Sequence, residues 1–260
     1  PYTTLFRSMK RQYILIFTIL SLFIQCKKSK TEALKNTKTK QIFAENNYDF
    51  GGKVKFELFS DSTYNFISTV KSPNYEKVEK FNGFCEVSND TIYFKPFEFE
   101  YTDSEKAVIK NNFIEFISDK SSFRIEIKKN SLKTINKLDF TEFKDYAIFT
   151  YKPENENSEF KPYDINQTEL KEIDRLLSKC FTENKSKLKS KNEYVKQCRI
   201  VTNANNEIEV WVNCYCKDKY DKSGFKYNLI QMNDGGNCNI SVKINLSKKE
   251  YSELNIAGLA

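Results

Sequence analysis

The side chains with the clearest chemical potential in this sequence are its seven cysteines, because the chain contains no histidine. Without an imidazole it lacks the commonest general base, the commonest metal ligand and the usual partner of a nucleophilic serine or cysteine. No glycine-rich phosphate loop, nucleophile elbow or zincin motif is present, and the carboxylates are scattered. We therefore expect a protein that is not an enzyme and has no catalytic, cofactor or metal site.

Three cysteines lie in alternating segments near the C-terminus. Cys214 and Cys216 fall on the apolar face of one expected strand, and Cys238 opens the apolar face of another. A closed zinc site needs four ligands, and three inward thiols without histidine do not supply them. We favour a disulfide from Cys238 to either Cys216 or Cys214, with buried free thiols as the alternative.

Three further cysteines fall on expected core faces. Cys180 lies on the apolar face of a predicted helix, and Cys198 shares a strand face with Ile200, so these two could bridge helix to sheet. Cys85 lies inward in the N-terminal strands, where we expect an unpaired core residue.

Short polar motifs carry weaker signals. Asp234-Gly235-Gly236-Asn237 between two expected strands predicts a hairpin turn with positive φ rather than a metal or phosphate loop. Ser62 and Thr91 each follow an aspartate and precede Thr or Ile. Both fit an Asp-Ser/Thr-apolar pattern that resembles a bacterial O-glycosylation signal, and both also fit ordinary turns.

The N-terminal segment has the pattern of an export signal. Met9 is the expected start, and residues 1–8 back-translate to a sequencing adapter. Residues 9–25 hold two basic residues and then an apolar run, Tyr13–Ile24, that is too short to cross a bilayer as a helix. Cys26-Lys27-Lys28 follows. This junction resembles the loose lipobox of Bacteroidota lipoproteins, with Gln25 departing from the usual small residue, and the resemblance implies a lipid on Cys26.

Residues 26–41 are polar and lysine-rich, and we expect them to form a flexible tether between the lipid and the fold. In related bacteria acidic residues after the lipidated cysteine are thought to mark surface-exposed lipoproteins. Because lysines stand there in this chain, we expect an outer-membrane lipoprotein on the periplasmic face.

The net charge of +7 comes from the N-terminal segment and the tether, because residues 1–40 hold nine basic side chains and one acidic one. Residues 41–260 carry 33 basic and 34 acidic side chains, so the folded part is close to neutral. Nucleic-acid binding generally needs a basic face, and we therefore expect no nucleic-acid partner.

Residues 42–150 alternate apolar and polar side chains in short runs separated by Asn, Asp and Ser turns. This pattern predicts an antiparallel β meander, either a small lipocalin-like barrel or a sandwich. Residues 151–165 hold Pro153 and Pro162 among acidic residues, and we expect them to be a linker between domains.

Residues 166–260 predict an α+β domain in which one helix covers an antiparallel sheet, a cystatin-like layout. The helix spans 167–181, with Asn166 as its cap and Glu169 completing a capping box. The expected strands are 194–201, 207–216, 225–232 and 237–246, with a last one near 251–256.

The C-terminal strands carry a family resemblance. The segments VWVNCYC at 210–216, DGGNC at 234–238 and KINL at 243–246 resemble the tail of a family of uncharacterised exported Bacteroidota lipoproteins. The resemblance covers about the last seventy residues and implies anchorage in the envelope without a particular activity. We expect a non-enzymatic role in binding, assembly or envelope maintenance, with an unknown protein partner. The alternative is a carrier that holds a small apolar ligand inside the N-terminal barrel, and an enzyme is a third, less favoured alternative because the chain has no histidine.

Overall fold

The computed structural model describes residues 38–48, 51–95, 104–117, 123–132, 137–153, 155, 157–219 and 224–258. The predicted leader, the lipidation site Cys26 and most of the tether lie outside these residues. Within them, no helix is both long and apolar enough to cross a membrane.

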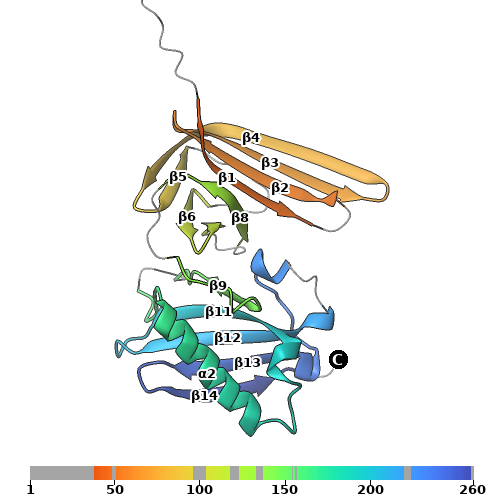
Figure 1. Ribbon diagram of the computed structural model, residues 1–260, viewed down its shortest axis with the longest axis vertical. Coiled ribbons are helices and arrows are strands. Elements are labelled where there is room, and N and C mark those ends of the chain that lie inside the picture. The colour runs from red at the N-terminus through yellow and green to blue at the C-terminus, as the bar shows by residue number, and fades with distance from the viewer. Residues whose placement is uncertain are drawn as a thin grey trace, which may run out of the picture. The chain divides into compact units, whose positions relative to one another are not determined.

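The N-terminal strands close into an eight-stranded barrel in which each strand pairs antiparallel with its neighbour in sequence and β1 pairs with β8 (Figure 1). This confirms the predicted antiparallel meander and selects a barrel over a sandwich. The strands are β1 (Lys40–Asn47), β2 (Lys53–Phe59), β3 (Thr63–Ser72), β4 (Tyr75–Ser88), β5 (Thr91–Lys95), β6 (Lys106–Lys110), β7 (Phe113–Phe116) and β8 (Phe123–Asn130).

Aromatic side chains fill the barrel interior. The rings of Phe94 and Phe116 stack with centroids 5.6 Å apart, and Phe94 also meets Tyr64 edge-on at 5.2 Å. Phe66 and Phe123 contact Phe116 from two other strands, with centroids 6.0 and 5.6 Å away. Because strand side chains alternate between faces, alternate residues of β1, β2, β3 and β8 add to this core, whereas β4 contributes Cys85 and the partly buried Phe81. The lumen among the described residues is a packed aromatic core.

The second sheet has six strands in the order β10-β11-β12-β13-β14, with β9 joining β11 in parallel. Its elements are β9 (Tyr146–Phe149), β10 (Lys161–Pro162), α2 (Gln167–Glu183), β11 (Tyr194–Thr202), β12 (Ile208–Cys216), β13 (Asn239–Asn245) and β14 (Glu250–Ile256). Short 3-10 turns occupy Lys191–Glu193, Lys217–Lys219, Gly224–Lys226 and Gly236–Cys238.

Helix α2 lies across one face of this sheet (Figure 1), where it contacts β13 and β14, and its apolar residues share one core with residues of β11, β12 and β13. Asn166 accepts hydrogen bonds from the backbone of Thr168 and Glu169, and the Glu169 carboxylate accepts one from the backbone of Asn166. The predicted helix and its capping box are therefore confirmed. One helix packed on a sheet also agrees with the predicted α+β layer.

Two expectations about this region are wrong. The strand Tyr146–Phe149, which we placed at the end of the first β domain, pairs with β11 in the second sheet. Residues 225–232 do not form a strand. They lie over the sheet face opposite α2, where Gln197 donates to the carbonyls of Phe225 and Asn228 and accepts from the amide of Ile230. A buried side-chain amide thus satisfies backbone groups that a strand partner would otherwise take.

Candidate functional site

The most unusual buried group is Arg124, on β8. Its neighbours Phe123 and Ile125 point into the barrel, so alternation points Arg124 outward. It is nevertheless only 2% exposed, because residues of the second sheet and of the 224–228 segment cover it. Thr39–Ala260 is one compact unit, and Arg124 lies between the barrel core and a small apolar cluster that includes Phe149 and Phe225 on the second sheet.

Two aromatic rings and two carbonyls hold the guanidinium. Its central carbon lies 4.1 Å from the ring centroid of Phe113, on β7, and 4.0 Å from that of Phe149, on β9. Nη1 donates to the carbonyl of Ile148 at 2.6 Å, and Nε donates to the carbonyl of Lys226. Burial lowers the pKa of Arg124 to about 10, against the opposing charge of Glu115, so the group stays charged at neutral pH.

Glu115 makes a second connection between the two cores. It is 3% exposed, and its carboxylate accepts hydrogen bonds from the backbone amide and the hydroxyl of Thr150, at 2.8 and 3.0 Å. Backbone pairing adds a third, since the Arg124 amide donates to the Tyr227 carbonyl at 3.0 Å. Charged hydrogen bonds of this kind fix geometry as well as adding stability.

A hollow of about 510 Å³ opens beside Arg124, within the range usual for small-molecule sites. We call it the junction hollow. Residues of the β6–β7 turn, of β8, of the segment before β9 and of the 224–226 turn line it: Asn111, Asn112, Phe113, Arg124, Glu126, Lys137, Leu138, Asp139, Phe140, Thr141, Lys144, Tyr146, Ala147 and Lys226. Cationic side chains outnumber acidic ones in this lining.

Sequence reasoning missed both Arg124 and Glu115. An outward position on an alternating strand normally faces water, and nothing local distinguishes Arg124 from the lysines around it. The one available signal is the pattern Phe123-Arg124-Ile125-Glu126-Ile127, in which an arginine occurs between apolar residues of a core strand.

The disulfide expected near the C-terminus is present, between Cys216 and Cys238, whose Cα atoms lie 4.8 Å apart. Because residues 225–232 are not a strand, β13 pairs directly with β12. The end of β12 therefore meets the turn before β13, and Cys216 rather than Cys214 is the partner. Asp218 lies with these two sulfurs within 4.8 Å, but sulfurs bonded to each other are not thiolate ligands.

The expected bridge between Cys180 and Cys198 is not formed. Both are free and buried, as are Cys214 and Cys85, the last as expected. Cys214 lies close enough to Cys180 and to Cys198 to interact electrostatically with each of these thiols. Burial raises the pKa of Cys180 to about 11 and that of Cys214 to about 12, which leaves them as unreactive thiols.

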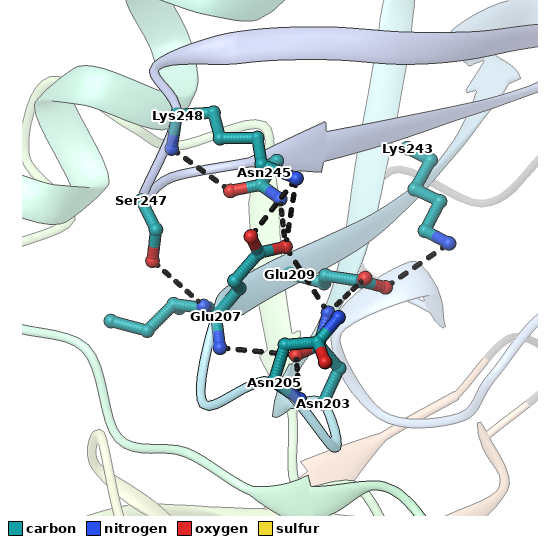
Figure 2. Close-up of polar contacts among 9 residues, drawn as sticks. Asn203, Asn205, Glu207, Glu209, Lys243, Asn245, Ser247 and Lys248 are labelled. Atoms are coloured by element: carbon teal, nitrogen blue, oxygen red, sulfur yellow. Dashed lines mark hydrogen bonds and ion pairs between the residues drawn. The ribbon is translucent and has the colours of Figure 1, made fainter.

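A second polar cluster, shown in Figure 2, joins the turn between β11 and β12 to the turn between β13 and β14. The Glu207 carboxylate lies 2.9 Å from Lys248 Nζ and accepts from the Asn245 side-chain amide at 2.9 Å. Glu209 lies 3.2 Å from Lys243 Nζ and accepts from Asn203 at 2.7 Å. Both carboxylates are thus paired with a lysine and an asparagine, and the cluster fastens the two turns to each other.

The remaining predicted positions lie apart from the junction hollow. Gly235 and Gly236 have φ of 110° and 55°, so positive φ is confirmed, but the turn opens a 3-10 helix instead of a hairpin. Ser62 is exposed in a turn at φ 63°, and Thr91 is half-buried at the start of β5. Their glycosylation stays a prediction.

Comparison with known proteins assigns no family. Neither the family models, nor the curated proteins, nor the solved structures contain a match to this chain. The junction hollow and the packed lumen must therefore be interpreted from their own chemistry.

Proposed function

We propose that this chain is an exported, lipid-anchored protein of the bacterial envelope whose role is non-enzymatic binding, with its binding surface outside the barrel. The observation that supports it is the packed aromatic lumen. A carrier in which the barrel holds an apolar ligand needs an internal cavity, and here rings from β3, β5, β7 and β8 meet in the interior.

The architecture supports a scaffold of this kind. The eight-stranded up-and-down barrel is compatible with the lipocalin-like layout that we propose, and the helix packed on the second sheet is compatible with a cystatin-like one. Likeness of layout carries no activity. Arg124 and Glu115 connect the barrel to the second sheet through hydrogen bonds, and these connections give a preformed surface where the two parts meet.

The choice between external binding and a barrel carrier is testable with an apolar fluorescent probe and an envelope pull-down. We expect no saturable binding of a fluorescent fatty acid by the folded chain, and specific retention of a partner from solubilised envelope by the lipidated protein. Stoichiometric fatty-acid binding that is lost in Phe116→Trp, which enlarges a ring in the lumen, would establish the carrier instead.

The anchor has its own test. Mass spectrometry of the membrane-extracted protein should find Cys26 as an acylated N-terminal residue, and Cys26→Ala should leave the protein unprocessed or release it from the membrane. An unmodified Cys26 in the membrane fraction would contradict lipidation.

The periplasmic orientation rests on the lysines that follow Cys26. Protease added to intact cells should leave the protein whole, and it should degrade the protein once the outer membrane is permeabilised. Loss of the protein from intact cells would place it on the outer surface.

A further inference from the structure

We propose that the junction hollow binds the carboxylate or phosphate group of a small organic anion, with Arg124 at its base. This inference rests on the proposed binding function and names the chemistry of the ligand. Three independent features of the hollow lead to it: an incompletely used guanidinium, the balance of charges in the lining and an apolar wall.

The guanidinium of Arg124 has five N–H donors. Nε and Nη1 each donate to a backbone carbonyl, whereas no acceptor for Nη2 is found among the residues that the structure describes. Nη2 is not among the fully buried side-chain atoms that lack a partner, so this donor is accessible from the hollow although the side chain as a whole is 2% exposed. Because the side chain lines the hollow, an oxyanion there would supply the missing acceptor, and guanidinium geometry suits carboxylate and phosphate.

The charges of the lining favour an anion. Both of its acidic residues already have partners, since Glu126 lies 2.7 Å from Lys128 Nζ and Asp139 accepts from the backbone and hydroxyl of Thr141. The lysines of the lining are Lys137, Lys144 and Lys226. Within the described ranges none of the three forms an ion pair with a carboxylate, although Lys137 lies near enough to Asp139 to lower the pKa of that carboxyl. Among the same residues, the ammonium groups of Lys144 and Lys226 face no such carboxylate partner. Convergent positive charge of this kind raises the local concentration of anions.

The rest of the wall is apolar and aromatic. Phe113, Leu138, Phe140 and Tyr146 line the hollow beside the charged groups. Leu138 and Tyr146 are buried members of the second core, so this part of the wall is preformed. An apolar or ring-bearing body resting on these side chains would orient the anionic group toward Arg124. The ligand class is therefore an organic acid or phosphate ester and not a bare inorganic ion.

Ligand-observed NMR with the full-length chain in neutral detergent micelles tests this directly. The probes are benzoate for the carboxylate, phenyl phosphate for the phosphate, and benzyl alcohol and benzylamine as neutral and cationic analogues of similar shape. We expect saturable binding of at least one anion, weakened by salt, and no saturable binding of the other two probes. The anion that binds more tightly identifies the group that the site prefers.

The variant series uses the exposed rim, so that folding is preserved. Lys137→Gln, Lys144→Gln and Lys226→Gln combined should weaken anion binding by about eightfold to a hundredfold, since each ammonium contributes about two- to fivefold. The matched control replaces Lys179, Lys185 and Lys187, three exposed lysines outside the hollow, and should leave binding unchanged. Arg124→Lys keeps the charge but loses the planar fork, and it should abolish binding where the variant folds.

Several results would overturn the proposal: benzyl alcohol binding as tightly as benzoate, equal losses in the two lysine triples, or no saturable binding of either anion. If an acidic hexapeptide binds and neither small anion does, the ligand of the hollow is a protein partner and not a small molecule. None of these results bears on the acylation of Cys26 or on the exclusion of fatty acid from the lumen, so the proposed function is judged separately.

Discussion

Arg124→Met replaces the buried guanidinium by an apolar side chain of similar length, and it tests whether this residue joins the two cores. The substitution removes two hydrogen bonds from a charged donor, each worth about 1.5–3 kcal/mol, and leaves the carbonyls of Ile148 and Lys226 without that donor. It also removes contacts with two rings, each worth about 1–2 kcal/mol when desolvated.

The substitution also removes the desolvation cost of a buried cation, several kcal/mol, because methionine carries no charge. Because the orphaned carbonyls stay buried, the losses exceed the gain, and we expect a net destabilisation of about 2–4 kcal/mol. Arg199→Met is the control. The Arg199 guanidinium lies 5.6 Å from the Trp211 ring on a half-exposed side chain, so its loss should cost less than about 1 kcal/mol.

Urea unfolding measured by two signals provides the assay. Trp211 is the single tryptophan and meets the rings of Tyr151 and Phe160 on the second sheet, so its fluorescence reports that sheet alone. Far-UV circular dichroism reports the barrel as well. We expect the two transitions to coincide in the native chain and to separate in Arg124→Met. An unfolding free energy within 1 kcal/mol of the native value, with coincident transitions, would refute the role of Arg124.

Three further changes have defined outcomes. Burial raises the pKa of Glu57, but hydrogen bonds from Lys40, Lys55 and Asn65 outweigh this effect and lower the pKa to about 2. The ionised carboxylate therefore stabilises the fold by about 1–2 kcal/mol after solvent screening. This stabilisation is present above pH 5 and is lost as the pH falls toward 2. The stability difference between the native chain and Glu57→Gln, measured by urea unfolding, should therefore shrink from pH 7 to pH 3, and a constant difference would contradict this. Cys238→Ser opens a bridge between residues 22 positions apart and should cost about 3 kcal/mol, with the linked peptide found only in non-reduced digests of the native chain. Asn166→Ala removes the cap of α2 and should cost about 1 kcal/mol in thermal or urea unfolding, whereas no loss would show that the capping box contributes nothing.

Local pattern was sufficient for most of the elements. Alternation in residues 42–150 predicted an antiparallel meander and placed Cys85 inward, because each face of a strand is set by a period of two residues. The spacing of Leu170, Ile173 and Leu177 and the Asn166 cap predicted α2, because helical period and capping are both local properties. The absence of histidine and the neutral folded part also limit the chemistry without any coordinates.

The sequence did not predict which strands pair, because a period of two residues determines which face a side chain takes and not which strand lies beside it. The parallel pairing of β9 with β11 and the adjacency of β12 and β13 both join segments distant in sequence. That adjacency selected Cys216 as the partner of Cys238, where the sequence left Cys214 equally open.

The junction hollow depends on tertiary structure most of all. On its own strand Arg124 is an outward cation, indistinguishable from a solvated one. It becomes a buried group only because Phe149 and the carbonyls of Ile148 and Lys226 approach it from segments 24 or more residues away. Burial, and with it the value of each hydrogen bond and charge, is a property of what packs against a residue, and no local sequence pattern records that.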